Sequence, residues 1–292
     1  MDNLRGIALM VGSMLGFALE DMFIKRASSA LPIGQILLSL SVVGTPLFAA
    51  AARRDGAAVW SRALLHRHVL ARNLGELVGT LGFVMAISLT PLTTATAIFQ
   101  ATPLVVTIGA ATLLGERVGV GSWLAMLVGL AGVLVVIQPG LDGFEPNSLW
   151  AVLAVLGLSV RDVTTRMVPP GVSTMQLAFS GFLSVGLLGA VLVVSGGGLL
   201  SPTPGQLGLL GGALLCGIVS YWAITEAMRA GEVAVVTPFR YSRLLFALVI
   251  GGLVFRERPD APTLAGAALV VFSGLYTLHC ERLKRREGVV PS

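Results

Sequence analysis

The chain has 292 residues, of which 55% are hydrophobic and 12% are charged, and its mean hydropathy is +0.87. A water-soluble domain carries about 25% charged residues. Too little polar surface remains to cover a globule in water, so the composition predicts an integral membrane protein and excludes a soluble enzyme.

Apolar segments follow one another along the chain, and a helix needs about 20 such residues to cross a bilayer. Breaks such as Pro139-Gly140 and Pro169-Pro170 separate most of them, although the division near 228–233 has no such break. The connections are short, so we expect no extramembrane domain. The sequence predicts an all-α protein with ten transmembrane helices, near residues 4–24, 33–52, 74–91, 94–114, 119–138, 148–168, 173–195, 206–228, 233–255 and 263–280.

The net charge of +5 is unevenly placed along the chain. If the N-terminus is cytoplasmic, the segments on that side carry most of the Lys and Arg, as cytoplasmic loops do. The second loop shows this most clearly, with Arg53, Arg54, Arg62 and Arg67. We therefore expect both termini in the cytoplasm, with 283–292 as a tail, and no nucleic-acid partner. Glu20 and Asp21 occupy the place where a signal peptide needs small residues, so the first segment is expected to be retained.

The two halves of the chain match without a gap at an offset of 141 residues. Each half, 1–138 and 145–282, holds five expected helices. Because five is odd, the second half must enter the membrane in the opposite orientation, which predicts two inverted-topology repeats. The matched positions include Asp21 with Asp162, Lys25 with Arg166, and Gly115-Glu116-Arg117 with Arg256-Glu257-Arg258.

Several motifs carry a resemblance to a known family. Pro103 lies in the fourth segment, and the first half opens with GIALMVGSMLGFALEDMFIK. The halves close with LLGERVGVGSWLAMLVGLAGVLVV and GGLVFRERPDAPTLAGAALVVFSG. Over essentially its whole length the chain resembles the EamA-type branch of the drug/metabolite transporter superfamily. The resemblance implies a central cavity lined by the first four helices of each half, with 119–138 and 263–280 at the periphery.

Arg240 and Arg243 are expected inside the ninth helix, where a charge normally faces a cavity or a partner. Their spacing of three places them on one helix face, and the forked guanidinium suits a carboxylate or phosphate. We expect at least one of them to bind substrate, with Arg243 as the main anion-binding residue. The alternative is that Arg240 snorkels to the interface while Arg243 pairs with a carboxylate. Tyr241 lies between them, and the equivalent positions Phe99 and Gln100 are expected to face the same cavity.

Glu76 is expected about one turn inside the third helix. It is predicted to pair with Arg240 or Arg243, to bind an amine, or to carry a proton as the coupling ion. The other interpretation is an interfacial carboxylate near Arg72. The equivalent position of the second half is Gly217, so Glu76 has no counterpart there, as is typical of a proton-coupling carboxylate.

Asp21 and Lys25, like Asp162 and Arg166, are spaced i, i+4 and so share a helix face. The spacing predicts an ion pair in each half. These pairs are interpreted as gates at the two mouths or as helix-end pairs inherited by duplication.

Tyr221 and Trp222, with Tyr241 and Phe99, are expected to form an aromatic wall of the cavity. Aromatic faces bind planar groups and cations. The alternative for these residues is ordinary packing.

The chain has no HExxH, GxSxG, P-loop or GxGxxG motif, and its three histidines form no ligand cluster. We therefore expect no enzyme activity, no metal and no cofactor. The predicted function is secondary transport of a small organic metabolite, chiefly an amino acid or derivative, across a bacterial inner membrane. The alternatives are uptake of a larger aromatic metabolite such as riboflavin or S-adenosylmethionine, and a membrane scaffold without substrate. The expected partners are the substrate and the bilayer, with the protein as monomer or homodimer.

Overall fold

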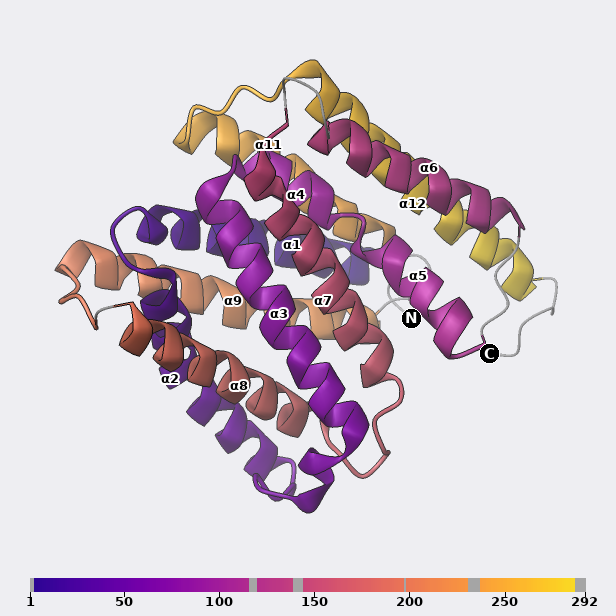
Figure 1. Ribbon diagram of the computed structural model, residues 1–292. Helices are drawn as coiled ribbons and strands as arrows, with labels where there is room; N and C mark the ends of the chain where they lie inside the picture. The colour runs from indigo at the N-terminus through magenta and orange to yellow at the C-terminus, as the bar shows by residue number, and fades with distance from the viewer. Residues whose placement is uncertain (1–2, 116–119, 139–143, 197, 231–236, 287–292) are drawn as a thin grey trace.

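The computed structural model describes residues 3–115, 120–138, 144–196, 198–230 and 237–286, and this part of the chain is helical with short 3-10 turns (Figure 1). The helices of the first half are α1 (Asn3–Ser28), α2 (Ile33–Arg54), η1 (Arg62–Leu65), α3 (Arg67–Leu89), α4 (Leu92–Phe99), α5 (Thr102–Leu113) and α6 (Val120–Ile137). Those of the second half are η2 (Pro146–Ser148), α7 (Leu149–Thr165), α8 (Thr174–Ser195), α9 (Pro204–Ala230), η3 (Thr237–Tyr241), α11 (Ser242–Val254) and α12 (Ala261–Arg286).

Each of the ten predicted segments contains helix, but several boundaries differ from the expectation. Helix α3 begins at Arg67, earlier than predicted, and α12 continues to Arg286, into the predicted tail. The stretch 231–236 lies outside the described residues. Within the described residues, seven helical segments are long and apolar enough to cross a membrane: Leu4–Ser28, Ile33–Arg54, Arg67–Leu89, Leu92–Leu113, Pro146–Thr165, Thr174–Ser195 and Pro204–Ile224. Shorter apolar stretches are Trp123–Ile137 and Ala261–Tyr276.

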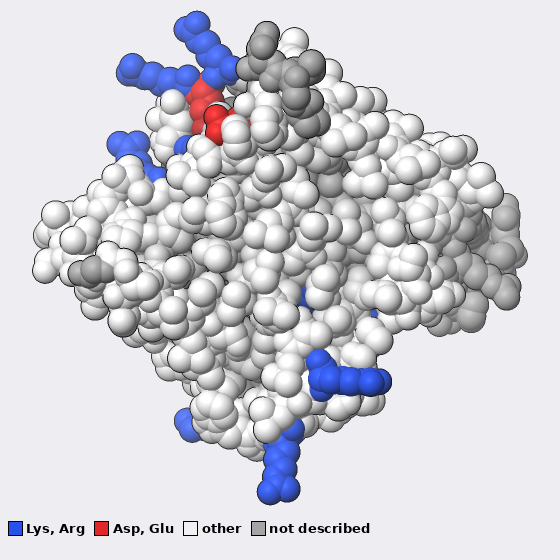
Figure 2. All heavy atoms as spheres, in the orientation of Figure 1, with Lys and Arg blue, Asp and Glu red and all other residues white. Residues whose placement is uncertain are grey.

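The charged side chains on the visible face gather at two opposite ends of the molecule (Figure 2). Between these ends lies a broad belt of surface that is almost entirely uncharged. Large apolar side chains such as Val194 and Leu253, 82% and 78% exposed, point outward from the helices. Hydrocarbon lipid tails satisfy such a surface, whereas water would not.

The halves are interleaved rather than set side by side. The principal helix contacts are α1 with α9, α3 with α7, α2 with α8, and α6 with α12, and each joins one half with the other. At the offset of 141 residues α1 corresponds to α7, and α9 to α3, so the first pair maps onto the second. The contact pattern is therefore symmetric under exchange of the halves. Figure 1 shows α3 and α7 side by side, with α6 and α12 together along one side.

Small residues let the helices of these pairs approach closely, as is common within membranes. At the α3–α7 contact, a Cβ added to Gly157 would lie 2.5 Å from the backbone nitrogen of Gly79. A Cβ on Gly75 would lie 2.7 Å from the backbone nitrogen of Arg161. The two backbones thus touch, which fixes the depth of α3 relative to α7.

The fourth predicted helix is broken in the structure. Helix α4 ends at Phe99 and α5 begins at Thr102, with Pro103 in its first turn. Proline lacks an N–H and disfavours helical geometry in the residue before it, so the helix is interrupted here. The ninth segment has a related interruption, where η3 gives way to α11 at Tyr241. The breaks meet, because Gln100 Nε2 donates to the Arg240 carbonyl oxygen at 3.4 Å.

Candidate functional site

The centre of the candidate site is a buried ion pair between Arg243 of α11 and Asp21 of α1. Arg243 Nη2 donates to Asp21 Oδ1 at 2.8 Å and to Oδ2 at 2.7 Å, and its Nε donates to Oδ2 at 3.1 Å. The two side chains are 13% and 3% exposed. Forked pairing of this kind is among the strongest polar contacts in proteins.

Three aromatic rings surround the same guanidinium. The Cζ atom of Arg243 lies 5.4 Å from the ring centroid of Phe17, and 5.2 Å from those of Phe83 and Phe99. The rings of Phe83 and Phe99 also pack on each other, at 4.6 Å between centroids. Cations within about 6 Å of a ring face are attracted by its electrons. We call Asp21, Arg243, Phe17, Phe83 and Phe99 the central cluster; α1, α3, α4 and α11 supply it.

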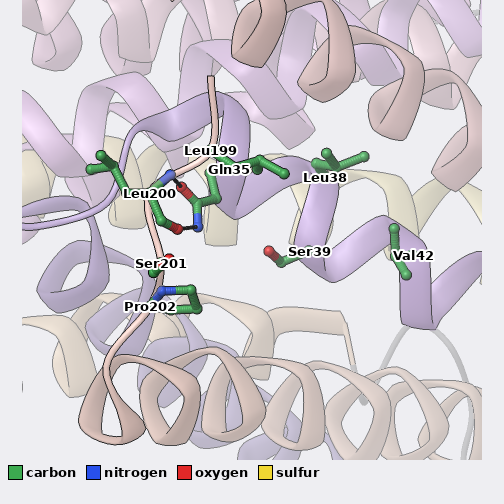
Figure 3. A pocket seen from close by; sticks show the side chains of 8 residues that line it. All are labelled: Gln35, Leu38, Ser39, Val42, Leu199, Leu200, Ser201 and Pro202. Atoms are coloured by element: carbon green, nitrogen blue, oxygen red, sulfur yellow. Dashed lines mark hydrogen bonds between the residues drawn. The ribbon is translucent and has the colours of Figure 1, made fainter. Parts of the chain in front are cut away.

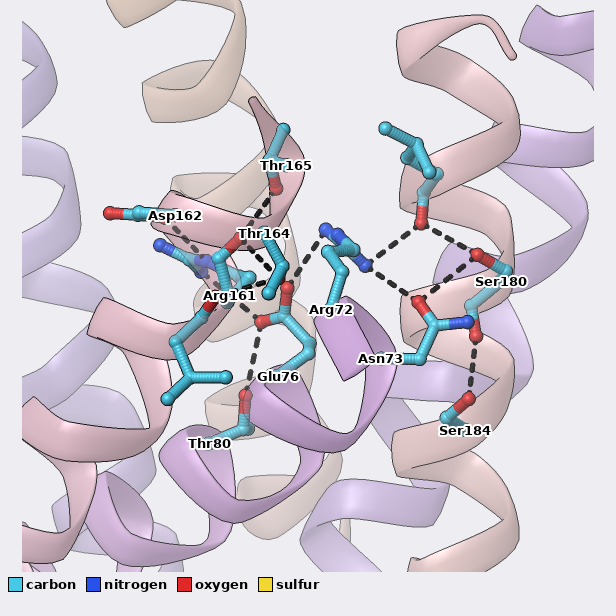
Figure 4. A network of polar contacts seen from close by, with 12 residues as sticks. Arg72, Asn73, Glu76, Thr80, Arg161, Asp162, Thr164, Thr165, Ser180 and Ser184 are labelled. Atoms are coloured by element: carbon cyan, nitrogen blue, oxygen red, sulfur yellow. Dashed lines mark hydrogen bonds and ion pairs between the residues drawn. The ribbon is translucent and has the colours of Figure 1, made fainter. Parts of the chain in front are cut away.

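A second polar network lies between α3 and α7 (Figure 4). Glu76 accepts from Arg72 Nη2 at 2.9 Å, Arg161 Nη1 at 3.3 Å and Thr80 Oγ1 at 3.3 Å. Arg161 also donates to Asp162 Oδ1 at 2.8 Å. Two arginines therefore neutralise Glu76: its partners are Arg72, which the alternative interpretation named, and Arg161, rather than the expected Arg240 or Arg243.

The network continues from α3 to α8 through Arg72. Its Nη1 donates to the Leu177 carbonyl oxygen and to Asn73 Oδ1, both at 3.0 Å. Ser180 donates to the same Asn73 oxygen at 3.2 Å, as Figure 4 shows. These contacts tie the network into the packing of three helices, which is typical of a structural role.

Glu20, one residue before Asp21, occupies a different environment. Its Oε1 atom lies 2.7 Å from the place where a Cβ on Gly217 of α9 would be. Among the residues that the structure describes, none makes a hydrogen bond or an ion pair with this carboxylate.

Lys25 and Glu257 join several helix ends about one turn beyond Asp21 along α1. Glu257 accepts from the backbone N–H groups of Leu92 and Thr93 at 2.6 and 3.1 Å, so it caps α4 from the other half of the chain. Lys25 Nζ lies 3.7 Å from Glu257 Oε1 and donates to the carbonyl oxygens of Ile87 and Thr90 at 2.9 and 2.5 Å. Four segments are thereby joined at this end.

A groove of about 520 Å³ opens at the edge of the molecule, away from the central cluster. Gln35 of α2 spans it and bonds both the carbonyl oxygen and the N–H of Leu200, at 2.7 and 3.0 Å (Figure 3). Its lining carries no charged side chain: Gln35, Leu38, Ser39, Val42, Leu199, Leu200, Ser201 and Pro202.

Comparison with known proteins decides the family. The model of the EamA-like transporter family matches residues 4–138 and, a second time, residues 146–278. The chain belongs to the EamA-like transporter family. It is therefore a multi-pass membrane protein built from two repeats of that family.

Curated relatives of this EamA-like protein are transporters of small molecules. It is 25% identical over 215 residues to the S-adenosylmethionine uptake transporter of Rickettsia bellii, covering 74% of this chain and 73% of the relative. It is 28% identical over 226 residues to the riboflavin transporter of Rhizobium johnstonii, covering 76% and 72%. It is 27% identical over 272 residues to the pseudopaline exporter of Pseudomonas aeruginosa, covering 91% and 93%.

A solved crystal structure shares the fold. It covers 95% of this EamA-like chain and 98% of its own, with a TM-score of 0.64 at 19% sequence identity. The likeness extends over both repeats.

The structure brings some of the expected site residues of this EamA-like protein together and separates others. Arg243 and Phe99 lie in the central cluster, and Gln100 borders it at the break between α4 and α5. The Arg240 side chain is exposed. Tyr241 is 6% exposed, but its hydroxyl group points at Gly274 of α12 rather than at Arg243.

The expected aromatic wall is not assembled. Trp222 is 59% exposed on α9 and lies outside the central cluster. Tyr221 is half-buried and packs edge-on against Phe48 of α2, at 5.7 Å between centroids. Of the rings around Arg243, the sequence predicted Phe99 but not Phe17 or Phe83. One signal was available for Phe17, which lies four residues before Asp21 on the same face of α1.

The expected pairing of Asp21 with Lys25 is replaced in the structure. Asp21 binds Arg243, and Lys25 lies beside Glu257. In the second half, Asp162 accepts from its neighbour Arg161, and the expected pair of Asp162 with Arg166 stays a prediction. The i, i+4 spacing placed Asp21 and Lys25 on one face of α1, but it did not account for Arg243 of α11, which binds this acid instead.

Proposed function

We propose that this EamA-like protein is a secondary transporter for a small metabolite of the amino-acid type. The observation that carries the proposal is the buried pair of Asp21 and Arg243. A guanidinium is suited to bind a carboxylate, and a carboxylate is suited to bind an ammonium group. An α-amino acid presents both partners in one molecule.

The Asp21–Arg243 pair allows its mutual contacts to be replaced by contacts to the substrate, with no buried charge left unpaired. When an amino-acid head group enters, its carboxylate replaces Asp21 on Arg243, and its ammonium group replaces Arg243 on Asp21. Each buried charge then has a partner before and after binding, which matters because an unpaired buried charge is strongly unfavourable. The rings of Phe83 and Phe99 hold the guanidinium in place during the exchange. Of the two arginines expected to bind substrate, these contacts favour Arg243 over Arg240, and they favour Asp21 rather than Glu76 as the group that binds the amine.

Alternating access follows from two inverted repeats. We place ten helices across a bacterial inner membrane, with both termini in the cytoplasm. The exchange-symmetric helix pairs support this arrangement, as does the concentration of Lys and Arg on one side of the predicted topology. Labelling of single cysteines introduced at residues 55 and 202 by a membrane-impermeant reagent tests it. The topology requires labelling from outside at 202 and protection at 55.

A larger aromatic metabolite is the second candidate, favoured by the names of the Rickettsia and Rhizobium relatives. S-adenosylmethionine belongs to both candidate substrate classes, because it joins an amino-acid head group to an adenine ring. Riboflavin has no such head group and would require a stacking surface. Trp222, the residue expected to stack, is exposed outside the central cluster, which favours the head-group mode of recognition.

Counterflow into proteoliposomes tests the proposal directly. Vesicles are preloaded with one unlabelled compound and offered the same compound labelled; the panel holds the common amino acids, norleucine, S-adenosylmethionine, S-adenosylhomocysteine and riboflavin. We expect exchange of at least one compound with an amino-acid head group. Arg243→Lys keeps the positive charge but loses the two-pronged guanidinium group. It should weaken the affinity of the protein for that compound about tenfold, as for loss of one charged hydrogen bond. Arg54→Lys, at the exposed C-terminal end of α2, is the matched control.

Other outcomes identify the alternatives. Exchange of riboflavin alone, abolished by Trp222→Ala, would replace the head-group mode with ring stacking. No exchange of any compound would support the scaffold. The contact expected for a scaffold, Arg243 fully paired with Glu76, is not the one formed, because Arg243 binds Asp21.

A further inference from the structure

Two positions that the repeat makes equivalent carry opposite charges. Arg161 of α7 corresponds to Glu20 of α1, and Glu76 of α3 corresponds to Gly217 of α9. Arg161 bonds to Glu76 at 3.3 Å, whereas Glu20 lies against Gly217. One site therefore holds a neutralised pair, and its counterpart holds a carboxyl group facing a residue without a side chain.

Few charged or titratable groups face Glu20. Asp21 follows it on α1, Arg243 reaches the same region from α11, and the Cys216 thiol lies nearby on α9. Arg243 has both its Nε and Nη2 atoms on Asp21. One positive charge thus stands beside two acids.

Among the side chains that the structure describes, the other elements packed on α1 add no compensating charge to this region. Helix α4 has no titratable residue, and Arg53 and Arg54 lie at the C-terminal end of α2. In α3, Arg72 and Glu76 are held in the network with Arg161. In η3, the Arg240 side chain is exposed and Tyr241 points toward α12. An acid without a partner inside a membrane is neutralised most simply by a proton or by a ligand's positive charge.

We propose that Glu20 holds an exchangeable proton, and that this proton gives way to a second positive charge on the substrate. This rests on the proposed function, because the amino-acid head group already occupies Asp21 and Arg243. With a zwitterionic substrate the site is balanced when Glu20 stays protonated. With a substrate that bears one further cationic group, balance requires the O–H bond of Glu20 to break and the proton to pass to water. The structure thus assigns Glu20 to the recognition of cationic amino-acid derivatives, and binding of one such molecule releases one proton.

The first experiment needs no substrate. Purified full-length protein is titrated with acid and base while the infrared band of protonated carboxyl groups is recorded in sodium-free and sodium-containing buffer. We expect a titrating band in the wild type that Glu20→Gln removes and Glu20→Asp retains in shifted form. Glu145→Gln, at an exposed position outside the cluster, should leave it unchanged. A band that survives in a monodisperse Glu20→Gln protein, or that sodium ions abolish at constant pH, overturns the proposal.

The second experiment uses two matched pairs from the transport panel. Lysine differs from norleucine, and S-adenosylmethionine from S-adenosylhomocysteine, by one positive charge on a similar frame. We expect the charged member of at least one pair to bind more tightly and to release a proton into weakly buffered solution. Glu20→Gln should abolish the release and reduce the preference about tenfold, as for a lost charged hydrogen bond. Equal binding within both pairs overturns the role of Glu20, whereas absence of counterflow for the whole panel overturns the proposed function.

Discussion

Removal of Arg243 alone should destabilise the protein far more than removal of the whole ion pair. Arg243→Met deletes three hydrogen bonds of 2.7 to 3.1 Å to Asp21. It also leaves a carboxylate that is 3% exposed without its partner. Breaking a buried pair in this way costs about 3–5 kcal/mol. Loss of the aromatic contacts adds about 0.5–1 kcal/mol.

The double variant should recover most of that loss. Asp21→Leu with Arg243→Met leaves no buried charge, and replacement of a buried pair by apolar side chains is often close to neutral. We therefore expect the double variant to be more stable than Arg243→Met by at least about 2 kcal/mol. The free energy of unfolding is measured for all variants in the same mixed micelles, on monodisperse full-length protein. Additive losses would refute the reasoning, because they would show that the two charges do not depend on each other.

Three further predictions concern packing and helix ends. Glu257→Ala removes the cap of α4 and should lower the free energy of unfolding by about 2–3 kcal/mol, since the lost hydrogen bonds involve a charged group. Gly157→Ala should lower it by about 1–3 kcal/mol through overpacking against the α3 backbone, whereas Gly208→Ala, with no atom within 4 Å of the added Cβ, should not destabilise it. Asp260→Ala removes the hydrogen bond to the Thr263 N–H at the start of α12 and should lower it by about 1 kcal/mol at neutral pH.

The effect at Asp260 should depend on pH in one direction. Hydrogen bonds from Thr263 hold the pKa of this carboxyl below its usual value of 3.8. The stabilisation is thus fully present above 3.8 and is lost as the pH falls through the lower folded-state pKa. The difference between wild type and variant should shrink in acid; a difference that grows there would contradict the assignment. Equal stabilities of Gly157→Ala and Gly208→Ala would contradict the packing prediction. A decrease of less than about 1 kcal/mol in the free energy of unfolding of Glu257→Ala would contradict the capping prediction.

Much of the fold follows from patterns that a single sequence displays. Runs of apolar residues located the helices, and the offset between Asp21 and Asp162 located the repeat. The break of the fourth helix was not predicted, although Pro103 marks it. Hydropathy does not distinguish one continuous apolar helix from two collinear ones, so the interruption is invisible to that measure.

The site was harder to predict, because its contacts join residues far apart in the chain. Arg243 was expected to meet an anion, and its carboxylate belongs to Asp21, which is 222 positions away. Spacing along one helix predicted Lys25 as the partner of that acid. A helical pattern states which side chains share a face, but not which face of another helix lies opposite. That information arises only from the crossing of α1 with α11.

The interleaved pairing of the helices has a consequence for biosynthesis. Because every principal pair joins one half with the other, the first five helices leave the ribosome before any of their main partners exist. The helix faces that carry the glycines therefore contact lipid until the second half is inserted and packs on them. A chain that ends near residue 138 should therefore be degraded rather than accumulate. The two halves, expressed as separate chains in one cell, should rescue each other by assembling into the complete protein.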